Sequence, residues 1–451
     1  MMKRSKRIFP VIVILILIST SMSCALVDWI IQWVGRLIPQ TGLAVETPQD
    51  SLTVLATMLT PTELTPEDTV EPSPTHTSEP EVTIEPTPTE VEMIDTQDTF
   101  MHRASLARLG VYQSPGPKRT PGLVWEFVTG DSIFSAPVIF EGTAYFGCYD
   151  GNFYAVEIQT GETLWTFFTG GSVLSSPALA DGILYFGNND GKLYALEAAT
   201  GKQVWVVETG GRVVSSPAVS EGMVYFGSYD GFLYALDPQT GAEVWKFEVA
   251  GLEDSEAGIS KGVSSSPAIS EGRVLFGSTQ VGGVSAELLF YSLDSETGEK
   301  LWEFTGWNNL ISPAVDKGVV YFGGFGSFYG LEVDTGSLVL DFDTNILTTA
   351  PAINQGVAYY GSESGLVFAL DLITGQTIWT VDTGSWSGLR TPSVSDGVVY
   401  IGSSDGFILA LDHPTGEKLW EYQADEGLNT SPVIHGGVLY IGGEAHLFAL
   451  K

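Results

Sequence analysis

Residues 175–205 contain the pattern that decides the fold. The segment opens with Ser175-Ser176-Pro177-Ala178, passes through Asp190-Gly191, and closes with Thr200-Gly201 followed by Trp205. Between these points lie short runs of β-branched, aromatic and other apolar residues, each of strand length. The Asp-Gly and Thr-Gly pairs indicate tight turns, because glycine accepts the positive φ that such turns require. The unit therefore predicts four short antiparallel strands.

The same unit recurs along the rest of the chain at intervals close to 40 residues. The tryptophan position, filled once by leucine, recurs at Trp125, Trp165, Trp205, Trp245, Trp302, Leu340, Trp379 and Trp420. The proline position recurs at Pro137, Pro177, Pro217, Pro267, Pro313, Pro351, Pro392 and Pro432. A period of this length is typical of a propeller or a solenoid. Short strands without a helical period favour an all-β, eight-bladed β-propeller with four-stranded antiparallel blades.

The two ends of the repeat array predict how the ring closes. The array begins with a lone tryptophan strand at 123–127 and stops at 447–450, which matches the third strand of the unit. Seven Thr-Gly turns serve eight proline segments, so one fourth strand is missing from the C-terminal end. We expect the N-terminal repeat strand to complete the last blade, which leaves no open edge in the ring.

The spacing Ala195-Leu196-Glu197-x-x-Thr200-Gly201-x-x-x-Trp205 resembles the tryptophan-docking repeat of the PQQ-like eight-bladed propeller family. The resemblance covers about 330 residues, 121–451. It implies that the repeat tryptophans pack between neighbouring blades, against the Thr-Gly turns. The residues assigned to this structural docking are Trp125, Trp165, Trp205, Trp245, Trp302, Trp379 and Trp420.

The same resemblance raises the question of quinone chemistry. Quinoprotein dehydrogenases of similar fold hold PQQ beside an adjacent cysteine pair, together with a calcium ion bound by carboxylate and Asn. Here Cys148 has no neighbouring cysteine, and Cys24 belongs to the leader. No nucleophile motif or phosphate loop is present. We therefore predict no catalytic, cofactor-binding or metal-binding residue, and we do not expect an enzyme.

The N-terminal region has the composition of a targeting signal followed by a flexible linker. Residues 1–23 combine four cations with a short apolar run and resemble a lipoprotein signal peptide that ends before Cys24, the expected lipidation site; an uncleaved signal anchor is the alternative. Residues 24–46 form an apolar, membrane-proximal segment. Residues 47–120 form a Pro/Thr-rich, acidic low-complexity linker, expected to be disordered. The rest of the chain, 121–451, is the propeller, placed outside the cytoplasm.

Charge excludes one large class of partner. The 451 residues include 20 Lys and Arg against 54 Asp and Glu, which gives a formal net charge of −34. Nucleic acids are held by clustered Lys and Arg side chains, so a nucleic-acid partner is not expected. The propeller is expected to be monomeric, with envelope or secreted proteins as partners and the membrane reached through the N-terminus.

Function in a repeat protein is expected where the sequence departs from its repeat. Two insertions lie between Trp245 and Trp302, which are 57 residues apart, and two tryptophans fall outside the repeat register. The connections that hold these departures leave a four-stranded blade from one face. The candidate binding face comprises Trp307, Asn308, Asn309, Trp386, Arg390, Arg212, Asn345, Asn429, Glu253, Asp254 and Gln280. The alternative for Trp307 and Trp386 is that they plug the central channel.

These observations favour a non-catalytic, extracytoplasmic binding scaffold anchored to a membrane. In anchor and fold it is similar to the propeller lipoprotein of the outer-membrane β-barrel assembly machinery, although the long linker departs from that plan. A PQQ- or metal-dependent oxidoreductase is one alternative. A propeller that recognises glycans or polymers through Trp307 and Trp386 is another.

Overall fold

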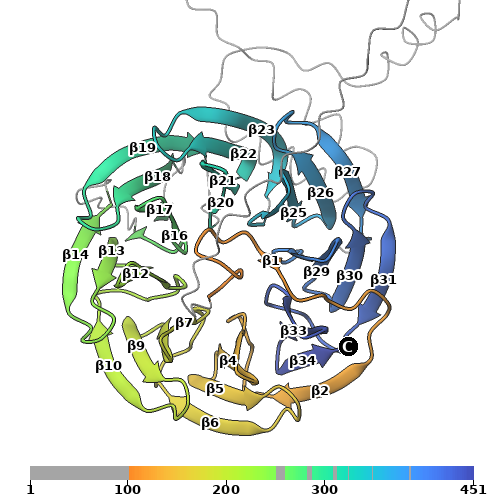
Figure 1. The fold of residues 1–451 in the computed structure, drawn as a ribbon, viewed down its shortest axis with the longest axis horizontal. Helices are drawn as coiled ribbons and strands as arrows, with labels where there is room; N and C mark the ends of the chain where they lie inside the picture. The colour runs from red at the N-terminus through yellow and green to blue at the C-terminus, as the bar shows by residue number, and fades with distance from the viewer. Residues whose placement is uncertain are drawn as a thin grey trace, which may run out of the picture. The chain divides into compact units, whose positions relative to one another are not determined.

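The computed structural model describes residues 101–249, 260–281, 287–307, 312–323, 325–347, 349–384 and 388–451. The strands in these ranges form eight sheets around one axis, as Figure 1 shows. Each sheet contains one blade of four antiparallel strands, so the predicted eight-bladed propeller is confirmed. No helix in the described ranges is both long enough and apolar enough to cross a bilayer. The predicted signal peptide, Cys24 and most of the predicted linker lie outside the described residues.

The first four blades follow the chain from the axis to the rim. Blade 1 contains β3 (Val138–Phe140), β4 (Thr143–Gly147), β5 (Asn152–Glu157) and β6 (Thr163–Phe168). Blade 2 contains β7 (Ala178–Ala180), β8 (Ile183–Gly187), β9 (Lys192–Glu197) and β10 (Gln203–Glu208). Blade 3 contains β11 (Ala218–Ser220), β12 (Met223–Gly227), β13 (Phe232–Leu236) and β14 (Glu243–Glu248). Blade 4 contains β16 (Ala268–Ser270), β17 (Arg273–Val281), β18 (Glu287–Asp294) and β19 (Lys300–Trp307).

The remaining blades repeat this order, except that the last blade takes its outer strand from the start of the array. Blade 5 contains β20 (Ala314–Asp316), β21 (Val319–Gly323), β22 (Phe325–Glu332) and β23 (Leu338–Leu347). Blade 6 contains β24 (Ala352–Asn354), β25 (Val357–Gly361), β26 (Leu366–Asp371) and β27 (Thr377–Asp382). Blade 7 contains β28 (Ser393–Ser395), β29 (Val398–Gly402), β30 (Phe407–Asp412) and β31 (Lys418–Gln423). Blade 8 contains β32 (Val433–His435), β33 (Val438–Gly442), β34 (His446–Leu450) and β2 (Leu123–Val128).

The ring closes as the ends of the repeat array predict. Strand β2 pairs antiparallel with β34, and Trp125 lies opposite Ala449. The backbone of Gly122 and that of Lys451 exchange two hydrogen bonds, of 2.8 and 2.9 Å. The first and last strands of the array therefore share one sheet, and the prediction of this closure is confirmed.

Aromatic side chains make much of the contact between neighbouring blades. Phe153 of blade 1 stacks on Phe186 of blade 2, with ring centroids 3.9 Å apart. Phe290 of blade 4 stacks on Phe322 of blade 5 at 4.0 Å. All four side chains are fully buried. Each such pair adds about 1 kcal/mol beyond the apolar area that it buries, so the stacks tie adjacent blades together.

The repeat tryptophans form a girdle near the rim. Each indole Nε1–H donates to a backbone carbonyl 31 to 50 residues further along the chain, or, for Trp420, to the carbonyl of Pro117. The indole also covers the glycine of a Thr-Gly turn. At Gly201, for example, an added Cβ would lie 2.6 Å from the Trp165 ring, so the turn must be glycine for the indole to approach it.

Residues 115–120, which the sequence analysis assigned to the linker, complete this girdle. The Pro117 carbonyl accepts from Trp420 Nε1 at 2.8 Å and from the Tyr400 hydroxyl at 3.1 Å. In blade 3 the equivalent pair, Trp245 and Tyr225, donates to one turn carbonyl. The eighth blade has no Thr-Gly turn to offer, and the segment before β2 supplies the missing acceptor.

Candidate functional site

The propeller has two faces that differ in how they depart from the repeat. We define the loop face as the connections from each outer strand to the next inner strand, such as 129–137, with the hairpins between second and third strands, such as 148–151. These two groups touch, since the Asp150 carboxylate accepts from Gly130 N at 3.0 Å. We define the turn face as the opposite side, which carries the Thr-Gly turns. The insertions and most of the unusual residues belong to the loop face.

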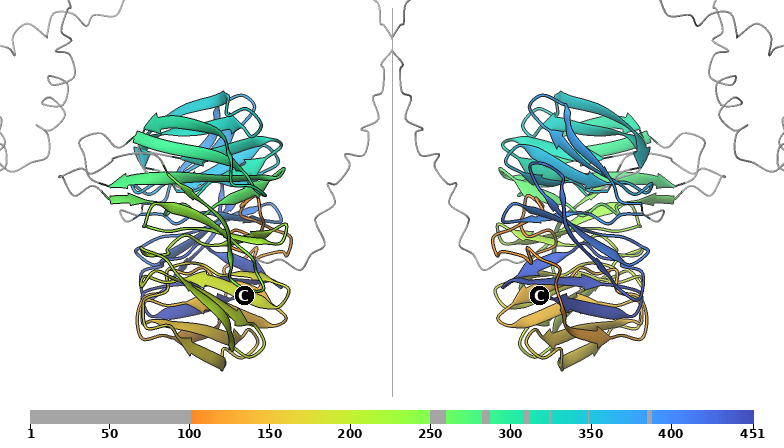
Figure 2. Two further views of the ribbon diagram at one scale, coloured as in Figure 1. Left: turned by 90° about the vertical axis from the view of Figure 1, so that its left-hand side faces the viewer. Right: turned by 90° about the vertical axis from the view of Figure 1, so that its right-hand side faces the viewer.

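On the loop face of blade 4, described residues that flank the two insertions lie side by side. A short additional strand, β15 (Ser260–Gly262), pairs antiparallel with the end of β17. In this pairing Lys261 lies opposite Gln280, so the flank of the first insertion runs beside the flank of the second. Figure 2 shows the described parts of β17 and β18 (green) projecting beyond the neighbouring blades.

Several predicted face residues lie in strands and not in loops. Trp307 is the last residue of β19 and lies opposite Glu287, and Asn345 belongs to β23. Expecting a loop at these two positions was wrong, because the outer hairpins of blades 4 and 5 continue past the ordinary end of the repeat strand. The predicted face residues Asn308, Asn309, Trp386, Glu253 and Asp254 lie outside the described residues.

Two predicted residues meet at the mouth of the central channel. Arg390 Nε donates to the Leu428 carbonyl at 2.7 Å, and its Nη2 donates to Asn429 Oδ1 at 3.0 Å. Because the guanidinium is largely buried, the pKa of Arg390 is lowered from its usual value. Arg212 lies elsewhere on the face, with its guanidinium carbon 5.1 Å from the centre of the Tyr229 ring. The structure thus groups Arg390 with Asn429, whereas Arg212 is exposed and contacts neither of them.

A cavity of about 300 Å³ opens beside this pair. We call it the mouth cavity, and its walls are the starts of the inner segments of blades 6, 7, 8 and 1. The residues that line it are His102, Phe134, Ala136, Thr349, Ala350, Leu389, Arg390, Thr391, Asn429, Thr430 and Ser431. Although the chain has 54 Asp and Glu residues, the described residues of this lining include no carboxylate.

An exposed aromatic pair lies next to the mouth cavity. Phe134 is 41 % exposed, Tyr149 is 42 % exposed, and their rings make an edge contact with centroids 5.9 Å apart. Sequence reasoning missed both residues because it searched for tryptophans outside the repeat register. An exposed pair of this kind is a typical anchor for a protein partner.

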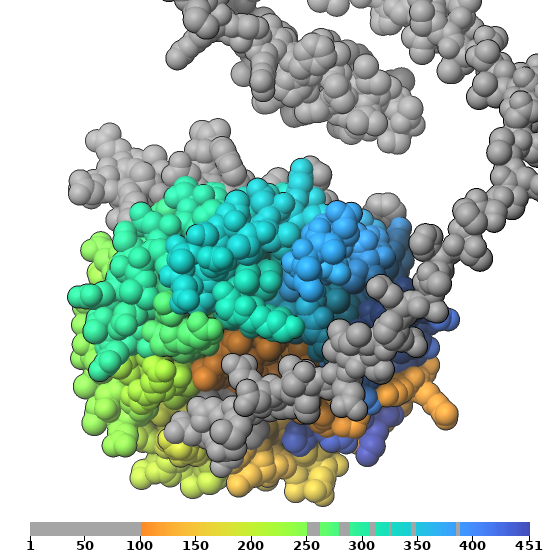
Figure 3. Space-filling view, turned by 45° about the horizontal axis from the view of Figure 1, so that its top comes forward, coloured from red at the N-terminus to blue at the C-terminus, as the bar shows by residue number. Residues whose placement is uncertain are grey.

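The centre of the channel is occupied by residues 101–114, which we call the plug. Figure 1 shows this segment crossing the middle of the ring, and Figure 3 shows the same orange residues deep between the blades. Its strand β1 (Val111–Tyr112) pairs in parallel with β28 of blade 7. Plug carbonyls also accept hydrogen bonds from the inner strands of four successive blades. The donor and acceptor pairs are Ile269 and Leu106, Val315 and Ala107, Ile353 and Leu109, and Val394 and Gly110.

The first of two buried arginines in the plug bridges blades 3 and 4. Arg108 Nε donates to the Pro267 carbonyl at 2.5 Å, and its Nη2 donates to the carbonyls of Ser216 and Pro217 at 2.8 and 3.2 Å. The side chain is fully buried. Burial lowers the pKa of Arg108 to about 9, and the nearby charge of Arg103 acts in the same direction.

The second plug arginine bridges blades 5 and 6. Arg103 Nη1 donates to the carbonyls of Ser312 and Pro313 at 3.4 and 3.3 Å, and its Nη2 donates to the Pro351 carbonyl. Burial lowers the pKa of Arg103 to about 9. Main-chain carbonyls of the inner segments therefore accept most of the hydrogen bonds of the two guanidinium groups, while the buried Nε of Arg103 has no partner among the described residues. Neither group forms an ion pair with a carboxylate of the described residues.

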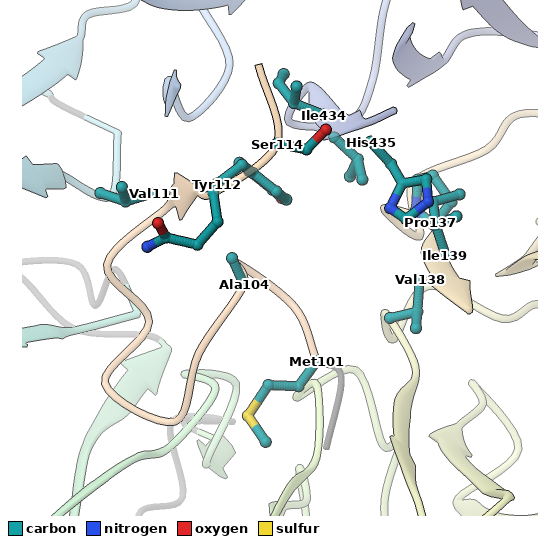
Figure 4. Close-up of a pocket in the computed structure, with 12 residues that line it drawn as sticks. Met101, Ala104, Val111, Tyr112, Ser114, Pro137, Val138, Ile139, Ile434 and His435 are labelled. Atoms are coloured by element: carbon teal, nitrogen blue, oxygen red, sulfur yellow. The ribbon is translucent and has the colours of Figure 1, made fainter. Parts of the chain in front are cut away.

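A second cavity lies on the other side of the plug, toward the turn face. It has a volume of about 300 Å³, and most of its lining residues are apolar. Figure 4 shows Met101, Ala104 and Val111 of the plug on one side of this cavity and Val138 and Ile434 of the inner strands on the other. The plug thus divides the axis into an apolar cavity and the polar mouth cavity.

The plug was not recognised in the sequence, although a signal for it exists. The run of acidic, Pro/Thr-rich residues ends at Asp98, and the next residues include Arg103, Arg108 and a series of apolar side chains. This change of composition separates 101–120 from the linker. Because the segment occurs once, the repeat gives no second copy by which to identify its role.

The sequence profile of one protein family matches most of the propeller. Its description is "Outer membrane protein assembly factor BamB", and it matches residues 150–289 and 285–451. The chain belongs to the BamB family. A comparison with curated proteins gave no match.

Solved structures share the BamB-family fold at low sequence identity. BamB from Moraxella catarrhalis is 20 % identical, with a TM-score of 0.61 over 73 % of this chain and 99 % of that one. A europium-containing methanol dehydrogenase is 14 % identical, with a TM-score of 0.63 over 78 % and 97 %. The quinohemoprotein alcohol dehydrogenase from Comamonas testosteroni is 17 % identical, with a TM-score of 0.64 over 78 % and 80 %. These likenesses establish the fold, which assembly factors and dehydrogenases share.

The residues of this BamB-family chain do not fit the PQQ and calcium site that the dehydrogenase likeness implies. Cys148 is buried, and burial raises the pKa of its thiol to about 11. Among the residues that the structure describes, no carboxylate lines either cavity on the axis. Within the described ranges, no group of three His, Cys, Asp or Glu residues is arranged to hold a metal ion.

Proposed function

We propose that this BamB-family chain is a non-catalytic, extracytoplasmic scaffold that binds an envelope or secreted protein through its loop face. The observation that carries the proposal is that departures from the repeat gather on this face. They include the β17–β18 hairpin with β15, the aromatic pair Phe134 and Tyr149, and the Arg390–Asn429 pair. Loops on a rigid ring are well suited to binding, because the ring fixes their ends.

The N-terminal sequence supports the location in this proposal. Four cations precede the apolar run at 8–18, and Cys24 follows at the position of a lipidated cysteine. In the proposed arrangement the lipid at Cys24 holds the chain to a membrane, and the acidic linker keeps the propeller away from it. A Pro-rich linker of some fifty residues reaches on the order of 100 Å. The name of the matched family is consistent with a role in outer-membrane assembly.

The proposal is tested by trimming the blade 4 extensions without breaking the blade. The backbone amides of Val249 and Val263 make the same hydrogen bonds to their hairpin as those of Thr209 and Val213 make in the preceding blade. Only Gly210-Gly211-Arg212 lies between Thr209 and Val213, so residues 250–262 can be replaced by the same three residues, Gly-Gly-Arg. Ser278 lies opposite Leu289, so residues 279–288 can be replaced by an Asn-Gly turn. We expect the trimmed propeller to fold and to capture at least about tenfold less of its partner from envelope extracts, a loss of about 1.4 kcal/mol.

A matched variant on the turn face separates binding from general damage. Glu141 and Asp181 both lie at exposed turns with positive φ, and changing both to Asn keeps these turns while removing two charges. This control should capture as much partner as the wild type. Equal capture by the trimmed propeller would contradict the choice of face. A cofactor absorbance or a stoichiometric metal in the purified protein would instead favour the oxidoreductase alternative.

A further inference from the structure

The mouth cavity contains positive and neutral polar groups in a strongly acidic protein. Arg390 contributes a guanidinium, His102 an imidazole, and Thr391, Thr430 and Ser431 contribute hydroxyls. Aspartate and glutamate outnumber Lys and Arg by 54 to 20 in the chain, yet none of the acidic residues that the structure describes lines this cavity. A buried guanidinium is stabilised by an anion with planar oxygen atoms, and the cavity wall supplies none.

Arg390 lines the cavity, and its hydrogen bonds use only part of its guanidinium group. Its Nε and one Nη2 hydrogen are held by Leu428 O and Asn429 Oδ1, which fix the plane of the group. Within the described part of the chain, Nη1 has no hydrogen-bond partner. The buried Nδ1 of His102, which also lines the cavity, has no hydrogen-bond partner among the described residues either. Two polar residues that line one cavity thus have unused hydrogen-bonding capacity.

We propose that the mouth cavity is a binding site for a carboxylate group. The Nη1–Nη2 edge of Arg390 would pair with both carboxylate oxygens, and the hydroxyls of Thr391 and Ser431 lie in the same wall. The carboxylate belongs either to a small organic acid or to the C-terminus of a peptide. This site is independent of the blade 4 extensions, so it can be tested apart from the scaffold function.

The experiment uses the full chain, with NMR-detected titration of four probes at constant ionic strength. The probes are acetate, the tripeptide Ala-Ala-Ala, the same tripeptide with an amidated C-terminus, and inorganic phosphate. We expect the free tripeptide or acetate to saturate the site and the amidated peptide to bind at least tenfold more weakly. Tighter binding of the tripeptide than of acetate assigns the site to peptide C-termini, whereas equal binding assigns it to small acids. Phosphate binding as tight as that of the carboxylates would overturn the assignment to carboxylates.

Three variants distinguish this site from a structural role of Arg390. Arg390→Gln should lose binding at least tenfold, and Ser431→Asp should block the cavity by supplying an internal carboxylate while keeping Arg390. Arg119→Gln removes an exposed guanidinium in the segment before β2, outside the candidate binding face, and should bind as the wild type does. Thermal unfolding of each variant checks folding. Unchanged binding in both Arg390→Gln and Ser431→Asp, or no saturable binding of any carboxylate to the wild type, would overturn the proposal.

Discussion

The rim and the axis of this propeller are built by opposite strategies. At the rim, one contact is repeated around the ring: an indole N–H reaches a turn carbonyl at 2.8 to 3.1 Å and covers the glycine of that turn. At the axis, a single segment contacts several blades at once, and Arg108 and Arg103 bind carbonyls of four different blades. Each tryptophan contact at the rim joins only two neighbouring blades, whereas the plug joins several blades at once.

This difference predicts where the ring is most vulnerable. A rim contact joins neighbours that also share aromatic stacks and backbone hydrogen bonds. The plug instead supplies main-chain carbonyls to four inner strands, and none of these contacts is repeated elsewhere in the described residues. Its loss would remove all of these contacts together, while the loss of one tryptophan would remain confined to one pair of blades.

The largest effect is expected from removing the plug and the segment that follows it. A chain that starts at Pro121 keeps β2 but lacks 101–120, so four inner-strand amides and the Trp420 indole lose their acceptors. At about 1 kcal/mol or more for each lost bond, the free energy of unfolding should fall by about 5 kcal/mol. Urea unfolding measures this value, with a chain that starts at Met101 as the control. Equal stability of the two chains would contradict the role given to the plug.

A single plug arginine should account for a large part of this stabilisation. Arg108→Met keeps the length and apolar stem of the side chain but leaves buried carbonyls, among them Pro267 O and Ser216 O, without a donor. Each unsatisfied buried group costs about 1 to 3 kcal/mol, so we expect a loss of about 3 kcal/mol in denaturant unfolding. Arg212→Met, at an exposed position in a loop, should change the free energy of unfolding by less than about 0.5 kcal/mol. If the two variants were equally stable, the Arg108 contacts would contribute nothing.

The one gap in the girdle should be open to improvement. Leu340 stands at the tryptophan position of blade 5, and its Cδ1 lies 3.4 Å from where a Cβ on Gly375 would be. Leu340→Trp restores the consensus contact and should raise the free energy of unfolding by about 1 kcal/mol. A melting curve compares it with Leu338→Trp, an exposed position of the same strand that should gain nothing. If Leu340→Trp were less stable than the wild type, blade 5 would not accept a tryptophan at this position of the girdle.

The smallest expected effect concerns the pH dependence of stability. Burial, with the charges of Arg108 and Arg103, lowers the pKa of His102 well below 6.5. The unfolded chain therefore takes up a proton that the folded chain does not, and stability falls as the pH decreases below that value. In His102→Gln this contribution is absent, so the wild type should lose stability relative to the variant between about pH 7.5 and pH 5.5. Parallel pH profiles of the two proteins would contradict this account.

The fold was predictable from the sequence because the same repeat unit occurs in every blade. The Pro, Asp-Gly, Thr-Gly and Trp positions fix strand order and turns in every blade, and the strands at 123–128 and 446–450 show how the ring closes. The plug was missed because a segment that occurs once has no register to compare. Residues 115–120 were missed for the same reason, although Pro117 takes the place of a turn carbonyl.

The candidate site was predictable only in part. Arg390 and Asn429 were chosen from their place in inter-blade loops, and the structure brings them into contact at 3.0 Å. His102, which completes the mouth cavity, comes from the plug and is hundreds of residues away in the sequence. Trp307 and Asn345 were expected in loops, but an outer hairpin can lengthen without any change in the repeat that precedes it. Contacts of this kind depend on the closed ring.

The most direct test of the account places a photo-crosslinking amino acid at matched exposed apolar positions on the two faces. Tyr149 represents the loop face and is 42 % exposed, and Ile373 represents the turn face and is 90 % exposed. In intact envelopes we expect a discrete crosslinked protein from position 149 and none from position 373, despite the greater exposure of the latter. A crosslinked partner from position 373 alone would contradict the assignment of binding to the loop face.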